Sequence, residues 1–287
     1  MKYSSGQDWM RSPRKRVMLF GMSGLGKTYL SSMLRASNTW FHYSVDYRIG
    51  TRYMGELIAD NFKREAMKVP FLRELLLSDS VYIASNITFD NLSPLSTYLG
   101  KPGSVTRGGL EFDDYMRRQN EHRAAEIAAM LDTGHFIDRA HDIYGLPHFV
   151  CDTSGSICEV VEPDAPGDPV LAALERELLM VWIRGSDAHT AELVRRFDRA
   201  PKPMYYQPAF LDRAWTEYRM EKGLRGDQVD PDAFIRWTYA RALAHRQPRY
   251  EAMARRGITI LAEEVADIRT PAEFDALIAR AIDRKKD

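Results

Sequence analysis

The chain contains short runs of mainly apolar residues, which are separated by longer and more polar segments. The runs lie at 17–20, 40–45, 148–151, 178–183 and 258–261. Short apolar runs of this kind are typical of strands that are buried on both faces of a parallel sheet. Between the runs, apolar residues recur at helical spacing, as in 30–34 and 274–282. The pattern predicts a three-layer α/β fold with a parallel sheet of about five strands.

One long stretch, 49–146, interrupts this alternation of strands and helices. It contains three segments with helical character, 52–78, 111–132 and a shorter one at about 135–144, and the residues between the first two are rich in Gly, Pro and Asn. Such residues predict turns rather than strands. We therefore predict a core built from residues 1–48 and 147–287, interrupted by a helical insertion at 49–146.

The most specific motif follows the first apolar run. Residues 21–28 read Gly-Met-Ser-Gly-Leu-Gly-Lys-Thr and fit G-x-x-x-x-G-K-[ST] at every fixed position, between a predicted strand and a predicted helix. Glycines let backbone amides wrap round a triphosphate, and the following helix adds the positive end of its dipole. Lys27 can reach the β- and γ-phosphates, and the Thr28 hydroxyl can ligate Mg²⁺. The motif predicts a site for ATP and Mg²⁺, with contacts from Gly21, Met22, Ser23, Gly24, Leu25, Gly26, Lys27, Thr28 and Tyr29.

The third apolar run ends in an acidic residue, Asp152. A carboxylate at the end of an apolar strand is the Walker B arrangement, which orients Mg²⁺ directly or through water. Asp152 and Gly155 also fit the D-x-x-G pattern of GTPases, but no N-K-x-D guanine-reading motif follows, so we do not favour a GTPase. We expect Asp152 at the metal, and an ordinary exit from strand to loop is the simpler alternative.

Two patterns carry a resemblance to a known group of enzymes. The inner pattern G-x-x-G-x-G-K-T of residues 21–28 resembles the phosphate loops of small P-loop kinases, such as shikimate kinase and the nucleoside monophosphate kinases. The pattern R-x-P-x-Y-x-x-x-A at 246–254, before the last predicted strand, is similar to shikimate kinases. The chain departs from shikimate kinases at Asp152, where they carry a glycine-rich segment, and in the greater length of the segment 49–146.

The resemblance implies further site residues. In shikimate-kinase-like proteins an aspartate after the second strand contacts the substrate hydroxyl, and Asp46 has the equivalent place here. In P-loop kinases a basic helix and loop after the fourth strand close as a lid, and its arginines neutralise charge on the transferred group. Arg196 and Arg199 are the preferred lid members, ahead of Arg195. The alternatives are that Asp46 caps a helix and that the arginines form a solvated helix end.

Composition narrows the class of protein. The 287 residues are 45% hydrophobic and 28% charged, as in ordinary soluble globular proteins. Lys and Arg together number 40, as do Asp and Glu, which argues against binding nucleic acid or a membrane by bulk charge. No window is apolar for long enough to span a membrane, and Cys151 and Cys158 have neither disulfide-framework nor usual zinc spacing. We therefore expect the protein to be located in a reducing cytoplasm.

The sequence thus predicts an ATP- and Mg²⁺-dependent phosphotransferase for a small hydroxyl- or phosphate-bearing molecule. Lys27, Asp46, Arg196 and Arg199 would be its catalytic residues, and 49–146 would be the acceptor- or partner-binding region. The alternative is a P-loop ATPase or nucleotide switch whose insertion binds a protein partner. A nucleic-acid end kinase is a third interpretation, which the neutral net charge disfavours.

Overall fold

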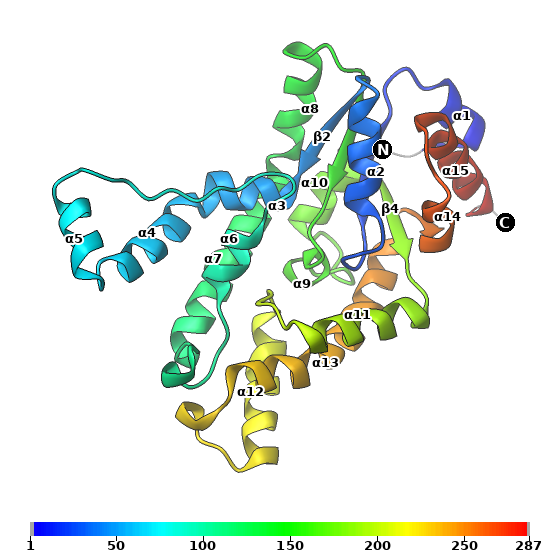
Figure 1. Ribbon diagram of the computed structural model, residues 1–287. Coiled ribbons are helices and arrows are strands. Elements are labelled where there is room, and N and C mark those ends of the chain that lie inside the picture. The colour runs from blue at the N-terminus through cyan, green and yellow to red at the C-terminus, as the bar shows by residue number, and fades with distance from the viewer. Residues whose placement is uncertain (1–2, 286–287) are drawn as a thin grey trace. The chain divides into compact units, whose positions relative to one another are not determined.

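The computed structural model describes residues 3–285, and the chain divides into two compact units (Figure 1). The first, which we call the sheet unit, runs to Val45, resumes over Ile127–Ala200 and continues from Thr238. The second, the helical unit, comprises Asp46–Glu126 and Pro201–Trp237. The helical unit therefore takes in 201–237 as well as most of the predicted insertion, while 127–146 belongs to the sheet unit.

The sheet unit contains a five-stranded sheet in which every neighbouring pair of strands is parallel. Its strands are β1 (Arg16–Phe20), β2 (Trp40–Ser44), β3 (His148–Asp152), β4 (Leu179–Arg184) and β5 (Ile258–Leu261). Their spatial order is β2-β3-β1-β4-β5. The strands are almost wholly buried, because helices cover both faces of a parallel sheet. The predicted α/β class with about five parallel strands is confirmed.

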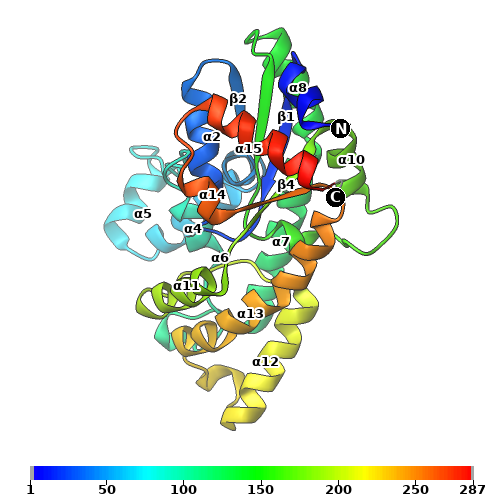
Figure 2. The same ribbon diagram turned by 90° about the vertical axis from the view of Figure 1, so that its right-hand side faces the viewer.

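Helices lie on both faces of this sheet (Figure 1). α2 (Lys27–Ala36) packs on β2 and β3, and α1 (Gly6–Arg11) packs on α15 (Pro271–Arg284) on the same side. α8 (Thr133–Asp142) and α10 (Pro169–Glu177) contact each other on the opposite face. The remaining helices of the unit are α9 (Ile157–Val160), α11 (Asp187–Arg199), α14 (Ala262–Ala266) and the later part of α13 (Pro231–Ala254). In Figure 2 the side of the unit that carries α14 and α15 faces the viewer.

The last helix illustrates how sequence pattern becomes packing. Thr270 precedes α15, and its hydroxyl accepts the backbone N–H of Glu273 at 3.2 Å, while the Glu273 carboxylate accepts the N–H of Thr270 at 2.9 Å. This capping box satisfies amides that the first helical turn leaves unpaired. The apolar stripe that follows is fully buried against the sheet, and its members are Phe274, Leu277, Ile278, Ala281 and Ile282.

The helical unit has helices and turns but no named strand among its described residues. Its helices are α3 (Val45–Arg48), α4 (Gly55–Ala66), α5 (Pro70–Leu77), α6 (Ser93–Leu99), α12 (Pro208–Lys222) and most of α7 (Phe112–Leu131), with the start of α13. A π-helical turn at Ile49–Tyr53 and 3₁₀ turns at Val105–Arg107 and Gly226–Gln228 complete it. The helical character predicted for this stretch is confirmed, whereas the predicted division of the chain into a core and an insertion at 49–146 stays a prediction.

Aromatic rings form the core of the helical unit where α7, α12 and α13 meet. Phe112 stacks on Trp215 with ring centroids 4.7 Å apart, and Trp215 meets Phe234 edge-on at 5.0 Å. α7 also buries polar side chains, and Gln119 uses its amide to hold the segment 204–206. Its oxygen accepts the backbone N–H of Tyr206 at 2.9 Å, which connects two regions that are distant in sequence.

Candidate functional site

Residues 21–28, which we call the phosphate loop after the motif that they fit, lie between β1 and the first turn of α2. The glycines of this loop are required by both conformation and packing. Gly21, Gly24 and Gly26 have φ angles of 141°, 81° and 95°, in the region that L side chains rarely adopt. A Cβ on Gly21 would lie 2.5 Å from the carbonyl oxygen of Ile183, and one on Gly26 would lie 2.7 Å from Val265 Cγ1. The two fixed glycines of the motif therefore have no room for a side chain.

Lys27 is the first residue of α2, and its side chain turns back into the loop. Its Nζ donates hydrogen bonds to the carbonyl oxygens of Gly21 at 2.8 Å and Met22 at 2.9 Å. The residue is only 7% exposed, so the ammonium is largely removed from bulk water. Buried charges require partners, and here the loop itself supplies them. The loop thus carries a partly buried positive charge at its centre.

The two predicted metal ligands differ in environment. Thr28 is exposed in the first turn of α2, whereas Asp152 is buried at the end of β3, in register with Leu19 of β1 and Ser44 of β2. Asp152 Oδ2 lies 3.7 Å from Nε2 of His42. Within residues 3–285, no group of three or more His, Cys, Asp or Glu side chains is arranged to hold a metal ion. A hydroxyl and a carboxylate nevertheless fit Mg²⁺, which prefers oxygen donors and usually keeps water and phosphate ligands.

The loop that follows β3 lies directly against the phosphate loop. A Cβ on Gly155 would lie 2.6 Å from the Ser23 hydroxyl oxygen and 3.4 Å from the Ser23 backbone nitrogen, so the two loops pack closely. The carbonyl oxygen of Gly155 accepts hydrogen bonds from the Tyr250 hydroxyl at 2.6 Å and from Arg246 Nη1 at 3.1 Å. Residues of α13 therefore hold a segment that supports the phosphate loop.

A buried ion pair reinforces the same segment. Arg246 Nη2 lies 2.6 Å from Glu159 Oε2, and the two side chains are 7% and 0% exposed. Arg249 donates to the carbonyl oxygens of Cys158 and Val161, both at 2.6 Å. The pattern R-x-P-x-Y at 246–250 thus has a structural reason, because its Arg and Tyr clamp the backbone after β3. Its polar residues were recognised from the sequence only as a pattern, without this role.

The surroundings of Arg246 and Tyr250 shift the pKa of each side chain in the direction that keeps its hydrogen bonds. Desolvation alone would lower the pKa of Arg246, but the adjacent Glu159 raises it above its ordinary value, so the guanidinium stays charged. Burial raises the pKa of Tyr250, so its hydroxyl remains a donor. Burial also raises the pKa of the Cys158 thiol to about 12, which agrees with a core role for this cysteine.

A hollow of about 510 Å³ opens beside the phosphate loop, within the sheet unit. Its lining comes from the loop, the first turn of α2, α11, and α14 with the residues that follow it, and comprises Gly24, Leu25, Gly26, Tyr29, His189, Ala262, Val265, Ala266 and Arg269. The Tyr29 hydroxyl donates to the Ile268 carbonyl oxygen at 2.8 Å, and Arg269 bonds to the same oxygen at 2.9 Å. The hollow therefore combines an apolar lining with fixed polar groups, as small-molecule sites commonly do. Beyond the motif itself, no sequence signal identified these residues.

The predicted lid arginines lie on α11. Leu193 of this helix would meet a Cβ on Gly24 at 3.4 Å, so α11 lies beside the phosphate loop. Phe197 anchors it by stacking on Tyr239, with ring centroids 3.8 Å apart. Arg196 is exposed, and its Nε donates to Glu192 Oε1 at 2.7 Å, a hydrogen bond that lowers the pKa of Glu192. Arg199, in the last turn, is also exposed.

Asp46 belongs to a different unit of the chain from the other predicted site residues. It lies in the first turn of α3 and is half-buried, and it belongs to the helical unit, whereas the phosphate loop belongs to the sheet unit. Its role at an acceptor hydroxyl stays a prediction.

Comparison with known proteins gives a distant structural likeness. No protein-family model and no curated protein matches the sequence. Among solved structures, the chain is similar to a shikimate kinase from Bacteroides thetaiotaomicron, at 15% identity and a TM-score of 0.36, over 95% of this chain and 96% of that one. The fold assignment rests on the parallel sheet and the phosphate loop described above rather than on this likeness. Across residues 3–285, no helix has both the length and the apolar character needed to cross a membrane.

Proposed function

We propose that the sheet unit binds ATP and Mg²⁺, and that the protein is an ATP-dependent phosphotransferase for a small hydroxyl- or phosphate-bearing acceptor. The observation that carries this proposal is the phosphate loop with the Lys27 ammonium held inside it by two loop carbonyls. An enclosed ammonium within a glycine-rich loop is suited to a triphosphate, which brings compensating negative charge. Phosphate oxygens would replace the carbonyl oxygens of Gly21 and Met22 as acceptors.

The remaining nucleotide contacts follow from the surroundings of the loop. We assign the base to the hollow beside Tyr29 and Arg269, because its apolar lining suits a ring and it adjoins the loop. Thr28 and Asp152 are the proposed Mg²⁺ ligands. When bound, the ion would neutralise charge on the β- and γ-phosphate oxygens.

Transfer would depend on positioning and charge stabilisation, as phosphoryl transfer generally does. Arg196 and Arg199 are the proposed groups that stabilise the transferred charge, since they are exposed on a helix next to the phosphate loop. Arg196 would exchange its bond to Glu192 for one to the phosphoryl group. Asp46 is the proposed residue that orients the acceptor hydroxyl.

Substitution of Lys27 tests the nucleotide site. We expect Lys27→Ala to lower ATP turnover by at least about 10²–10³, the cost of losing one strong transition-state contact. Binding of ATP, measured by calorimetry, should weaken as well. Lys68→Ala is the matched control, because Lys68 is an exposed lysine just after the end of α4. Unchanged ATP binding in the Lys27 variant would overturn the assignment.

The base assignment has its own test. Ala266 is exposed and lines the hollow, so Ala266→Trp would fill it without disturbing the core. We expect the affinity for ATP to fall by about tenfold or more, which corresponds to about 1.4 kcal/mol. The affinity for tripolyphosphate, which has no base, should stay the same. Ala272→Trp, at an exposed position of α15 outside the hollow, is the control.

A second candidate is an ATPase or nucleotide switch with a protein partner, and one observation favours it. α5 and the residues around it expose large apolar side chains, among them Phe71 and Leu77 at 68% each and Tyr82 at 89%. Exposed apolar clusters of this kind mark interaction surfaces. Incubation with Mg²⁺-ATP and pooled metabolites, followed by mass spectrometry, separates the candidates. A phosphorylated metabolite supports the phosphotransferase, and turnover that needs no metabolite and rises with a protein partner supports the switch.

A further inference from the structure

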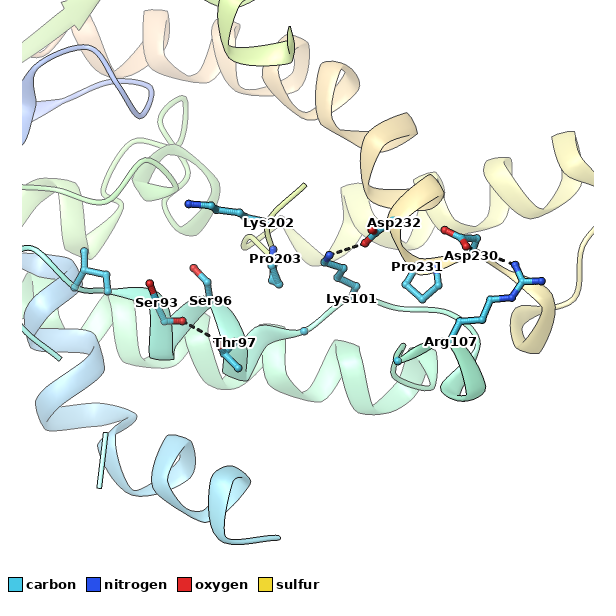
Figure 3. Close-up of a pocket in the computed structure, with 13 residues that line it drawn as sticks. Ser93, Ser96, Thr97, Lys101, Arg107, Lys202, Pro203, Asp230, Pro231 and Asp232 are labelled. Carbon is cyan, nitrogen blue, oxygen red and sulfur yellow. Dashed lines mark hydrogen bonds and ion pairs between the residues drawn. The ribbon is translucent and has the colours of Figure 1, made fainter. Parts of the chain in front are cut away.

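The helical unit contains a groove with a volume of about 760 Å³, a size typical of small-molecule sites (Figure 3). Three segments of chain form it: α6 with the loop that follows, the residues around Lys202 and Pro203, and the start of α13. All three belong to the helical unit, and none of the site residues predicted from the sequence lines the groove. The groove is therefore a separate feature from the phosphate loop.

The loop that forms one wall is fixed in place by close backbone packing. Gly103 has φ 143°, and a Cβ there would lie 2.7 Å from the carbonyl oxygen of Val229. A Cβ on Gly109 would lie 2.7 Å from Pro231 Cγ. The N–H of Ser104 donates to the same Val229 oxygen at 2.8 Å. The wall is thus docked on the start of α13, so the groove is formed before a ligand arrives.

Two ion pairs connect the walls across the groove (Figure 3). Lys101 Nζ lies 2.5 Å from Asp232 Oδ1, and Arg107 Nη1 lies 3.5 Å from Asp230 Oδ2. Asp230 also accepts the backbone N–H of Ala233 at 2.8 Å, so this carboxylate is held by the helix start. These four charges balance one another.

Lys202 adds a positive charge that no carboxylate among the described residues balances. It lines the groove, it is exposed, and it has no ion-pair or hydrogen-bond partner among residues 3–285. Figure 3 shows its ammonium extending to the side of Ser93 and Ser96, away from Lys101. The Ser96 hydroxyl likewise has no hydrogen-bond partner within the described chain. The groove therefore offers one cation and free hydroxyl donors at one end, and carboxylates at the other.

We propose that this groove binds a phosphate monoester of a small polyol. The phosphate would pair with Lys202 and accept a hydrogen bond from Ser96, since lysine binds phosphate as a point charge and hydroxyls reach its several oxygens. Hydroxyl groups of the polyol would donate to the Asp230 and Asp232 carboxylates, whose two oxygens can each accept more than one bond. A neutral polyol would leave the Lys202 charge without a counter-charge, so we expect it to bind less well. We expect the phosphate ester to bind in the absence of ATP.

Calorimetry on the full chain tests the ligand class. The probes are inorganic phosphate, glycerol 3-phosphate, ribose 5-phosphate and glucose 6-phosphate, with gluconate as a carboxylate and sorbitol as a neutral polyol. We expect at least one phosphate ester to bind with a Kd of about 1 mM or tighter. Sorbitol should not bind, and gluconate should bind more weakly. Absence of binding by all phosphate esters at about 10 mM, ten times that Kd, overturns the proposal.

Substitutions locate the binding in the groove. Lys202→Ala should weaken the best phosphate ester by about tenfold or more, and Lys202→Arg, which keeps the charge, by less than about threefold. Lys68→Ala, an exposed lysine of the same unit that lies outside the groove, should have no effect. Because Lys202 is exposed, the thermal midpoint should be unchanged, which excludes misfolding as a cause. Equal binding by wild type and Lys202→Ala overturns the site.

The proposal and the phosphotransferase function fail separately. Lys27→Ala tests the nucleotide site alone, so binding of the phosphate ester should survive in that variant. A phosphorylated product that forms equally well in Lys202→Ala would show that the groove holds a ligand other than the acceptor. Sorbitol binding as tightly as the phosphate esters would contradict the role of Lys202 in the groove.

Discussion

The phosphate loop of the sheet unit and the groove of the helical unit both depend on closely packed glycines, but they differ in how deeply their ion pairs are buried. The phosphate loop is supported by buried charge, because Arg246 and Glu159 pair with 7% and 0% exposure behind the loop after β3. The groove has ion pairs that face solvent, and Lys101 and Asp232 are 23% and 45% exposed. One wall of the groove is held by the close packing of Gly103 against the backbone of Val229.

The difference teaches where each region is vulnerable. A buried ion pair that loses one member leaves an uncompensated charge, which is strongly destabilising. An exposed pair already interacts with water, so the loss of one member costs little. We therefore expect the loss of a charged side chain to damage the sheet unit more than the helical unit.

Arg246→Met should produce the largest effect. It leaves the Glu159 carboxylate buried without its partner, so the free energy of unfolding should fall by about 3–5 kcal/mol. Urea denaturation measures the change. The double variant with Glu159→Leu should recover much of the loss, since both charges are then gone. A loss below about 1 kcal/mol, typical of exposed pairs, would break the contrast between the units.

Acid should destabilise the helical unit through His122. Burial lowers the pKa of this histidine to about 4, so the folded chain keeps it neutral while the unfolded chain binds a proton near pH 6.5. Stability is therefore present above about pH 6.5 and is lost as the pH falls towards 4, by up to about 3 kcal/mol. Unfolding in urea at a series of pH values checks this.

His122→Phe is the control for that pH dependence. Phenylalanine cannot take up a proton, and it can keep the stacking on Tyr205, whose ring centroid lies 5.0 Å away. The variant should lose less stability between pH 6.5 and pH 4 than the wild type. Glu126, whose Oε2 lies 3.6 Å from His122 Nδ1, opposes the effect of burial when ionised. Parallel pH profiles of wild type and variant would contradict the prediction.

Gly103→Ala should affect the groove wall more than Gly108→Ala. The added Cβ at 103 would lie 2.7 Å from a backbone oxygen, whereas the one at 108 has nothing within 4 Å, although φ is 79° there. We expect a loss of about 2–3 kcal/mol at 103, from strain and overpacking, and about 1 kcal/mol at 108, from strain alone. Thermal unfolding compares the two. Equal shifts would show that the wall is not docked as described.

Lys101→Met should have the smallest effect on stability. It removes an ion pair whose members are 23% and 45% exposed, and such pairs contribute about 0–1 kcal/mol. Urea denaturation beside Arg246→Met gives the direct comparison. A loss comparable to that of Arg246→Met would mean that the groove depends on charge as strongly as the phosphate loop does.

The phosphate loop could be predicted because its residues are contiguous. Gly21, Gly26 and Lys27 all lie within residues 21–27. The positive φ values of the loop favour glycine at the positions that the motif fixes. Asp152 was predictable as the end of an apolar strand. The α13 clamp at 246–250 was visible as a pattern, but its partners, Gly155 and Glu159, are 91 and 87 residues away from Arg246.

The groove could not be predicted for the same reason. Lys101 and Asp232 are 131 residues apart, and the glycines between 100 and 109 gave only a signal for turns. Lys202 follows the basic segment at 195–199, so its composition indicated a lid rather than a second site. No periodicity of the chain connects these segments.

The sequence by itself determined the parallel α/β sheet and the phosphate loop, because strand burial and backbone conformation are encoded by neighbouring residues. Only the tertiary structure decided how the chain divides into units, that 201–237 joins the helical one, and that Lys101, Lys202 and Asp232 share a groove. These features depend on contacts between distant residues, and each contact becomes favourable only when packing has already brought its members together.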